Sequence, residues 1–171
     1  YWALRDLIPR TPIQLWLDER VEHKHELKEA ETSFPPNFQP IVPIKEIAPG
    51  QCNEMVFGYD MYRLLYHSQM TLNIHTPYSH NYVGNMRMFE ACGTGACLVS
   101  DTGMNIDELF EADKEFVSFT SVDECVEKVN YLLDNNDKRK EIAQAGRKRI
   151  LKDHTLEKRC LELHHIISDM L

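Results

Sequence analysis

The sequence predicts an α/β fold in which a Rossmann-like parallel sheet carries helices on both faces. Stretches with apolar residues at helical spacing alternate along the chain with short apolar runs of strand length. Turn-rich or glycine-containing segments separate several of these stretches. The length of 171 residues, 43% of them hydrophobic, favours one core over two full domains. Elements that alternate in this way bury their apolar faces as a parallel sheet between helices.

The first elements are a helix and a strand, and a poorly patterned segment follows them. Residues 1–10 place leucine and isoleucine at helical spacing, and the apolar run 13–17 has the length of a buried strand. Charged residues then dominate up to about Lys28, and five of the eight prolines lie within residues 33–50. We therefore expect segment 18–56 to be irregular or inserted.

The middle of the chain repeats the alternation of helix and strand. Met61, Leu64 and Leu65 lie on one face of a helix predicted over residues 59–69. Further strands are expected at 70–75, 96–101 and 115–119, with helices at 85–92 and 105–110. We expect these strands and the run 13–17 to share one parallel sheet.

Two helical regions close the chain. In residues 121–135 six apolar residues form one stripe, and Ser121 with Glu124 forms a capping box at the start of the helix. Apolar residues after His154 recur at spacings of three and four, which predicts an amphipathic terminal helix. Lysine and arginine concentrate between Lys138 and Arg159. This charge suits peripheral contact with an acidic membrane surface or a partner, but on helices it more often marks a solvated face.

Composition argues against several classes of protein. The formal net charge of −8 disfavours nucleic-acid binding, because phosphate neutralisation requires lysine and arginine in excess. The five cysteines are odd in number and include no CxxC pair, so neither a disulfide framework nor a zinc site is expected. No apolar run has the length of a membrane span. We expect a cytoplasmic protein with reduced thiols, no metal and no cofactor, and expect this chain, which begins with tyrosine, to be part of a longer protein.

The clearest chemical pattern follows the predicted strand 70–75. Ligands of parallel sheets bind at the carboxyl ends of the strands, where helix N-termini converge. Gly84 and Asn85 open a helix there, so its free backbone N–H groups and dipole suit a phosphate, and Arg87 adds positive charge. Glu90 lies on the same helical face, and its carboxylate suits the two hydroxyls of a ribose. The pattern indicates a nucleotide, although this spacing more often makes an ordinary intrahelical ion pair.

Two strand ends supply further candidates. His75 ends the strand 70–75 and is placed to touch a bound sugar or phosphate, as is His80 in the following loop. Loop histidines are more often structural or exposed, and no third ligand at a recognisable spacing points to zinc. Asp101 ends the strand 96–101 and can line the same pocket, although Asp-Thr-Gly is equally a turn signal.

Longer stretches of the sequence resemble a known family. The runs "GYDMYRLLYHSQMTLNIH", "GNMRMFEACGTGACLVSD" and "DELF", and the helical region that ends "AQAGRKRILKDHTLEKR", are similar to the C-terminal domain of group 1 GT-B glycosyltransferases. Within that superfamily the chain most resembles the branch typified by the spore-maturation CgeB-like proteins. The likeness covers residues 58–159, and its most specific part is "RMFEACGTG" followed by an apolar strand.

The resemblance implies that residues 1–171 are a single C-terminal nucleotide-sugar-binding domain, the C-terminal half of a GT-B fold. In such enzymes this domain holds the nucleotide-sugar donor, and an N-terminal domain of similar fold holds the acceptor. That acceptor domain and the first strand of the donor domain are expected to lie outside this sequence. We therefore expect no sugar transfer by this segment alone.

The resemblance also implies roles for single residues. Glu90 matches the glutamate that binds the donor ribose, and Gly84 and Asn85 match the loop that meets the diphosphate. Many relatives carry a second glutamate where this chain has Tyr82. Such enzymes generally need no bound metal. The donor-binding residues expected in total are Tyr82, Gly84, Asn85, Arg87, Glu90, His75 and Asp101.

The implied function is transfer of a sugar from a nucleotide diphosphate sugar to an acceptor such as a growing surface glycan. Catalysis would come from positioning and from stabilisation of the departing diphosphate by Gly84, Asn85 and Arg87. A noncatalytic Rossmann-like binding module is an alternative, because a fold does not fix a function. A GT-B-type nucleotide-sugar epimerase, which would bind the same donors, is another.

Overall fold

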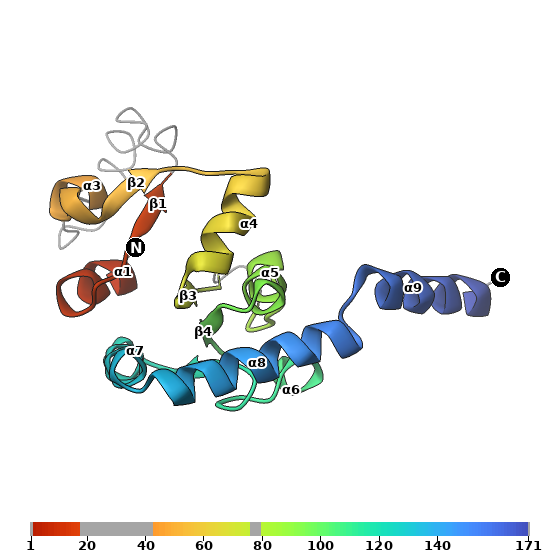
Figure 1. Cartoon of the computed structure of the whole chain (residues 1–171). Helices are drawn as coiled ribbons and strands as arrows, with labels where there is room; N and C mark the ends of the chain where they lie inside the picture. Colours follow the sequence, from red (N-terminus) through yellow and green to blue (C-terminus); the bar gives the residue numbers. More distant parts are fainter. Residues whose placement is uncertain (1, 18–42, 76–79, 171) are drawn as a thin grey trace. The chain divides into compact units, whose positions relative to one another are not determined.

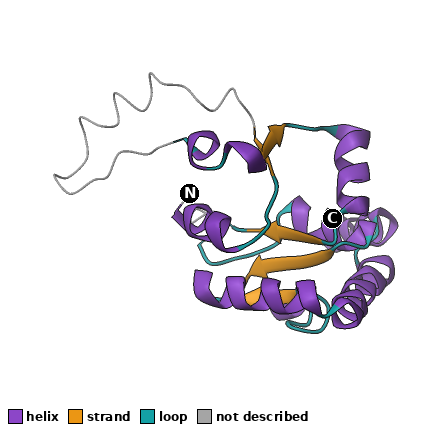
Figure 2. Ribbon diagram, turned by 60° about the vertical axis from the view of Figure 1, so that its left-hand side comes forward, coloured by secondary structure: helices purple, strands orange, loops and turns teal. Residues whose placement is uncertain are grey.

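The computed structural model describes residues 2–17, 43–75 and 80–170. The chain consists of two compact units, residues 1–57 and residues 58–171. Figure 1 labels the helices and strands, and Figure 2 shows them by type. The ladders between named strands are all parallel. The expected α/β fold with parallel sheets flanked by helices is confirmed.

The first unit contains a small two-stranded sheet. Its elements are helix α1 (Trp2–Leu7), the 3-10 turn η1 (Ile8–Arg10), strand β1 (Leu15–Leu17), helix α3 (Ile44–Ile47), the 3-10 turn η3 (Pro49–Gln51) and strand β2 (Cys52–Glu54). Strand β1 pairs in parallel with β2, and a buried cluster of Ile8, Leu15 and Ala48 packs beside the pair. The side-chain amide of Gln51 donates to the carbonyl of Ile13 at 3.0 Å, which ties η3 to the start of β1.

Two expectations about this first unit need correction. Residues 18–42 of the segment expected to be irregular lie outside the described residues, but residues 44–54 form α3, η3 and β2. The prediction that the run 13–17 shares a sheet with the later strands is wrong, because β1 pairs with β2. An apolar run predicts burial of a strand without naming its neighbour, and the polar sequence of β2 gives no strand signal of its own.

The second unit contains a three-stranded parallel sheet and six helices among its described residues. They are α4 (Gly58–His67), β3 (Met70–Asn73), α5 (Met86–Thr94), β4 (Cys97–Asp101), α6 (Ile106–Leu109), β5 (Val117–Phe119), α7 (Val122–Asp134), α8 (Asn136–Asp153) and α9 (Leu156–Met170). The strand order is β3-β4-β5. The predicted parallel pairing of these three strands is confirmed.

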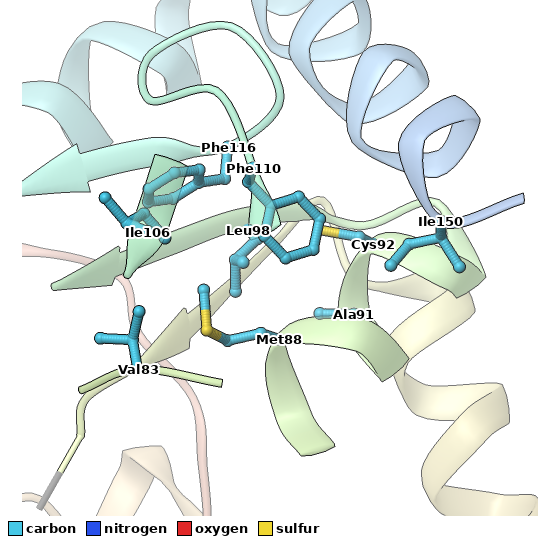
Figure 3. Packing of buried hydrophobic residues seen from close by; sticks show 9 residues of the cluster. All are labelled: Val83, Met88, Ala91, Cys92, Leu98, Ile106, Phe110, Phe116 and Ile150. Atoms are coloured by element: carbon cyan, nitrogen blue, oxygen red, sulfur yellow. The ribbon is translucent and has the colours of Figure 1, made fainter. Parts of the chain in front are cut away.

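A buried cluster fixes α5 on this sheet. Figure 3 shows that side chains from α5, β4, α6, α8 and the adjoining loops meet in one core. Met88 and Ala91 of α5 are fully buried there, so the opposite face of α5 carries its polar residues. The members of the cluster are Val83, Met88, Ala91, Cys92, Leu98, Ile106, Phe110, Phe116 and Ile150.

The cysteines of this unit behave as packing residues. Cys92, Cys97 and Cys125 are buried and free. Burial raises the pKa of Cys92 and of Cys97 to about 12, because the low-dielectric core disfavours the thiolate. These thiols are therefore protonated and unreactive at neutral pH.

Helix α7 begins with the predicted serine cap. The hydroxyl of Ser121 accepts a hydrogen bond from the backbone N–H of Glu124 at 3.2 Å. The Glu124 carboxylate closes the cap on Thr120 rather than on Ser121, accepting from the Thr120 backbone and hydroxyl at 2.8 Å each. These bonds, the backbone bond foremost, lower the pKa of Glu124 to about 2.

The last two helices differ in how they are anchored. Helix α8 packs against α5 and β4, and its buried Arg139 donates to the carbonyl of Leu132 and to Asn136. Helix α9 forms as predicted, but none of its described residues is buried. Its apolar side chains Leu156, Leu163, Ile166, Ile167 and Met170 are therefore exposed.

Among the described residues, no helix has both the length and the apolar character needed to cross a membrane.

Candidate functional site

The candidate residues surround the carboxyl ends of β3 and β4 and the N-terminus of α5. All of them belong to the second unit. The loop that leads into α5 begins with His80 and Asn81 in the left-handed region, at φ of 49° and 66°. Gly84 follows at φ 130°, a conformation that favours glycine. The chain can therefore turn sharply just before the first free N–H groups of α5.

A second loop, after β4, holds this turn in place. Asn105 accepts from the backbone N–H of Val83 and donates to its carbonyl, both at 2.8 Å. The backbone N–H of Met104 donates to the carbonyl of Asn81 at 2.8 Å. Gly103 lies so close to the Asn81 carbonyl that a Cβ atom there would collide with it. The position of Gly84 is thus set by contacts across two loops.

The start of α5 is tied to the strand ends by a chain of hydrogen bonds. Asn85 caps the helix by accepting from the Met88 backbone at 3.3 Å, and its side-chain amide donates to Asn73 at 2.8 Å. Asn73 in turn donates to the hydroxyl of Ser100 at 3.0 Å. Asn73 and Ser100 are buried, so each of these bonds satisfies a polar group removed from water.

His75 and Asp101 meet at the same edge. The ring Nδ1 of His75 lies 2.7 Å from the Asp101 carboxylate, which also accepts from the His75 backbone at 3.0 and 3.1 Å. The other ring nitrogen, Nε2, accepts from the backbone N–H of Gly84 at 3.3 Å. The His75 side chain is 8% exposed and that of Asp101 27%. We call Asn73, His75, Asn85, Ser100 and Asp101 the strand-end cluster.

Arg87 and Glu90 form a separate group on the face of α5. Their guanidinium and carboxylate lie 3.1 Å apart, which is the ion pair that the i, i+3 spacing allows. Tyr62 of α4 donates its hydroxyl to the other carboxylate oxygen of Glu90 at 3.1 Å. This hydrogen bond and the nearby negative charge raise the pKa of Tyr62. We call Tyr62, Arg87 and Glu90 the helix-face cluster.

The structure brings most of the predicted site residues into contact with one another. His75, Gly84, Asn85 and Asp101 belong to one connected network, whereas Arg87 and Glu90 pair with each other. Tyr82 is 56% exposed and lies in the loop before α5.

Sequence reasoning missed Asn73, Ser100, Asn105 and Tyr62. Asn73 and Ser100 are polar residues inside otherwise apolar strand runs, which is a signal that could have found them. Nothing local identifies Asn105 or Tyr62, because their partners lie 22 and 28 residues away.

Among the described residues, no group of three histidine, cysteine, aspartate or glutamate side chains is placed to hold a metal ion.

Solved structures with the same fold include two larger proteins. The structure of Anabaena HepE in complex with UDP-glucose matches 96% of this chain and 51% of that chain, with 14% identity and a TM-score of 0.60. Sucrose-phosphate synthase from Thermosynechococcus elongatus matches 98% of this chain and 42% of that chain, with 10% identity and a TM-score of 0.67. This chain thus spans about half the length of these proteins or less.

A further structure is a single domain. The C-terminal domain of LpcC, a group 1 family glycosyl transferase from Francisella tularensis, matches 90% of this chain and 76% of that chain, with 16% identity and a TM-score of 0.56. At these identities the likenesses establish the fold. A search by sequence among curated proteins gave no significant match.

Sequence comparison with protein families gives a direct assignment. The profile of the family described as glycosyl transferase-like matches residues 45–165. That span contains the strand-end cluster, the helix-face cluster and the core that positions them. The chain therefore belongs to the glycosyl transferase-like family.

Proposed function

We propose that this chain binds a nucleotide diphosphate sugar as the donor-binding part of a glycosyltransferase. The observation that carries the proposal is the family match over residues 45–165, which includes all the candidate donor residues. The UDP-glucose bound to HepE supports a uridine diphosphate sugar as the first donor to test. We assign the chain to the group 1 GT-B enzymes, in the CgeB-like branch, on the motifs quoted above.

The diphosphate would lie against the N-terminus of α5. Backbone N–H groups there point away from the helix without partners inside it, and the helix dipole favours negative charge. Gly84 exposes the backbone for close approach, and Asn85 caps α5 through Met88, so the earlier N–H groups are left to an anion. Arg87 is 38% exposed and adds a positive charge in the first turn.

The ribose would lie against Glu90. One carboxylate oxygen already accepts from Tyr62 and the other from Arg87. Each oxygen of a carboxylate has two lone pairs, so each can accept one further hydroxyl. Tyr62 and Arg87 therefore fix the direction of the carboxylate without occupying all of its lone pairs, which suits recognition of two neighbouring hydroxyls.

The rest of the reaction requires parts that this chain does not supply by itself. Since the chain spans 51% of HepE, we propose that an N-terminal domain binds the acceptor, for example a growing surface glycan, and that reaction takes place in the cytoplasm. The basic stretch between Lys138 and Arg159 is proposed as a peripheral contact with an acidic membrane surface.

One observation favours a noncatalytic binding module as the second candidate. Both oxygens of Glu90 have protein partners, so the helix-face cluster is complete as a structural ion pair without any ligand. Tyr82 in place of an acid is consistent with that role. In this case Glu90 would support only the packing of α4 against α5.

The two candidates differ in what Glu90→Gln does to nucleotide binding. A donor site predicts weaker binding of uridine and UDP by about 1.5 to 3 kcal/mol, roughly tenfold to over a hundredfold, because hydrogen bonds to a charged acceptor are lost. Arg87→Gln should weaken UDP and barely affect uridine, because only UDP carries the phosphates and Tyr62 still holds the Glu90 carboxylate. Calorimetric titration of the protein with both ligands measures these differences.

Helix α9 offers a matched control for this experiment. Arg159 and Glu162 form an arginine–glutamate pair at the same i, i+3 spacing, 2.6 Å apart, outside the proposed site. Glu162→Gln should leave both affinities unchanged. Unchanged UDP affinity in folded Glu90→Gln would favour the noncatalytic module, and sugar transfer by this chain alone would refute a separate acceptor domain.

A further inference from the structure

His75 is held between an acid and a backbone amide in a way that assigns its protonation state. Its Nε2 accepts from the N–H of Gly84 at 3.3 Å, so this nitrogen carries a lone pair. Its Nδ1 lies 2.7 Å from the Asp101 carboxylate, so this nitrogen carries the proton. These two contacts fit a ring with its proton on Nδ1 and a lone pair on Nε2.

Several hydrogen bonds hold the Asp101 carboxylate beside the ring. The carboxylate accepts from the His75 backbone N–H at 3.0 and 3.1 Å and from the Ser100 hydroxyl at 3.3 Å. Its contact with the ring is shorter, at 2.7 Å. In the described part of the chain, the charged group that contacts the imidazole is the Asp101 carboxylate. From the neighbouring elements, α5 supplies Arg87 and Glu90, which pair with each other.

Helix α6, which follows the loop after β4, carries two more charged residues in its first turn, Asp107 and Glu108. No hydrogen bond or ion pair in the described structure joins them to His75. The charge in contact with the ring is thus negative and comes from Asp101.

A diphosphate at the N-terminus of α5 would change this balance. It would place negative charge on the Nε2 side of a ring that already has a carboxylate on its Nδ1 side. Two anions on opposite sides of an imidazole favour the doubly protonated ring, which donates to both. The N–H of Gly84, which now donates to Nε2, would be released to donate to the phosphate instead.

We propose that His75 takes up one proton as the diphosphate binds and becomes its cationic ligand, with Asp101 as the residue that positions it. This inference rests on the proposed function and adds a proton to its binding step. The proton comes from solvent and enters Nε2, while the Nδ1–H bond to Asp101 is kept. Binding of a bare nucleoside should take up no proton at this site.

Calorimetry in buffers of different ionisation enthalpy measures the proton directly. The observed enthalpy of UDP binding should vary with the ionisation enthalpy of the buffer, and the slope gives the number of protons taken up. The number for the wild type minus the number for His75→Gln should be close to one. This difference removes any proton taken up by UDP itself. UDP affinity should fall as pH rises in the wild type and depend less on pH in His75→Gln, whose affinity should be roughly tenfold lower.

Two further variants separate positioning from packing. Asp101→Asn should keep the protein folded but reduce proton uptake, because an amide stabilises the imidazolium less than a carboxylate does. His164→Gln, at an exposed histidine of α9, is the matched control and should change neither uptake nor affinity. Full uptake in Asp101→Asn would overturn the role given to Asp101.

Nitrogen-15 NMR of the imidazole provides a test that does not depend on affinity. Free protein should show His75 as the neutral Nδ1–H tautomer, and the UDP complex should show both nitrogens protonated. A ring that stays neutral in the UDP complex would overturn this inference and leave the proposed function standing. Absence of binding by both UDP and inorganic pyrophosphate would overturn the proposed function and this inference with it.

Discussion

The strand-end cluster and the helix-face cluster lie at two parts of α5 and use similar contacts. Each is built on a carboxylate that accepts from a nitrogen donor, at 2.7 Å for Asp101 with His75 and at 3.1 Å for Glu90 with Arg87. Their surroundings differ. The strand-end cluster joins β3, β4 and the loop before α5. The two acids are both partly buried, with Asp101 27% and Glu90 14% exposed, but the groups they hold differ: His75 is 8% exposed, whereas Arg87 is 38% and Tyr62 44% exposed.

This difference in burial decides what each cluster contributes. A buried polar group that loses its partner also loses the water that would replace it, so breaking the strand-end cluster should unfold part of the site. An exposed group exchanges its partner for water at little cost. The helix-face cluster can therefore open for a ligand, while the strand-end cluster holds the backbone that a ligand would meet.

The largest effect is expected where the supporting loops touch. In Gly103→Ala the new Cβ would collide with the Asn81 carbonyl and lie 2.8 Å from Val83 Cγ1. Backbone atoms cannot move aside as a flexible side chain does, so we expect the free energy of unfolding to fall by about 3 kcal/mol. Urea unfolding measures this change.

The control for that substitution lies in α5 itself. In Gly93→Ala the Cβ would meet only Ile150 Cγ2 at 3.6 Å, an ordinary contact. Replacing a helical glycine by alanine should leave stability unchanged or raise it by up to about 1 kcal/mol. Equal losses in both variants would show that the contact between the two loops is not what supports the site.

Removal of one acid from each cluster tests the comparison directly. Asp101→Ala leaves the His75 ring and backbone N–H without their acceptor, and we expect a loss of about 2 kcal/mol in the free energy of unfolding. Glu90→Ala should cost about 0.5 kcal/mol or less, because the Arg87 and Tyr62 groups that it leaves are exposed enough to bond with water instead. Similar losses for the two variants would contradict the view that the burial of the partner groups separates the clusters.

A double-mutant cycle on Arg87 and Glu90 should give a small coupling. Substitution of each and of both by alanine should yield about 0.3 to 0.5 kcal/mol, the usual value for a helical i, i+3 ion pair. Added salt should reduce the coupling further, because exposed charges are screened. A coupling that is large and independent of salt would place this pair with the buried cluster.

The smallest expected effect is a titration of Tyr62. Its pKa is raised because its neutral hydroxyl donates to Glu90 and a phenolate there would face the carboxylate. The linked stability is therefore complete below the ordinary value of about 10 and is lost as pH rises through the raised value. NMR titration of labelled tyrosine should show this pKa falling toward the ordinary value in Glu90→Gln, and an unchanged value would rule out the hydrogen bond as its cause.

Much of the second unit could be predicted from local pattern. The spacing of apolar residues located α4, α5 and α7, and the apolar runs located β3, β4 and β5. Gly95 ends α5 in the left-handed conformation at φ 92°, which is the usual role of a glycine just after a helix. These features depend on residues within one or two turns of each other, so the sequence carries them directly.

The sequence by itself determined the α/β alternation, the family resemblance and the candidate residues from His75 to Asp101. Tertiary structure alone decided that β1 pairs with β2, that Asn105 holds Val83, and that His75 lies between Asp101 and Gly84. The physical reason is that the periodicity of apolar residues indicates which side of a helix or strand is buried. It does not indicate which other element that side packs against. A hydrogen bond requires a specific partner within about 3 Å, and only the packed chain brings such distant residues to that distance.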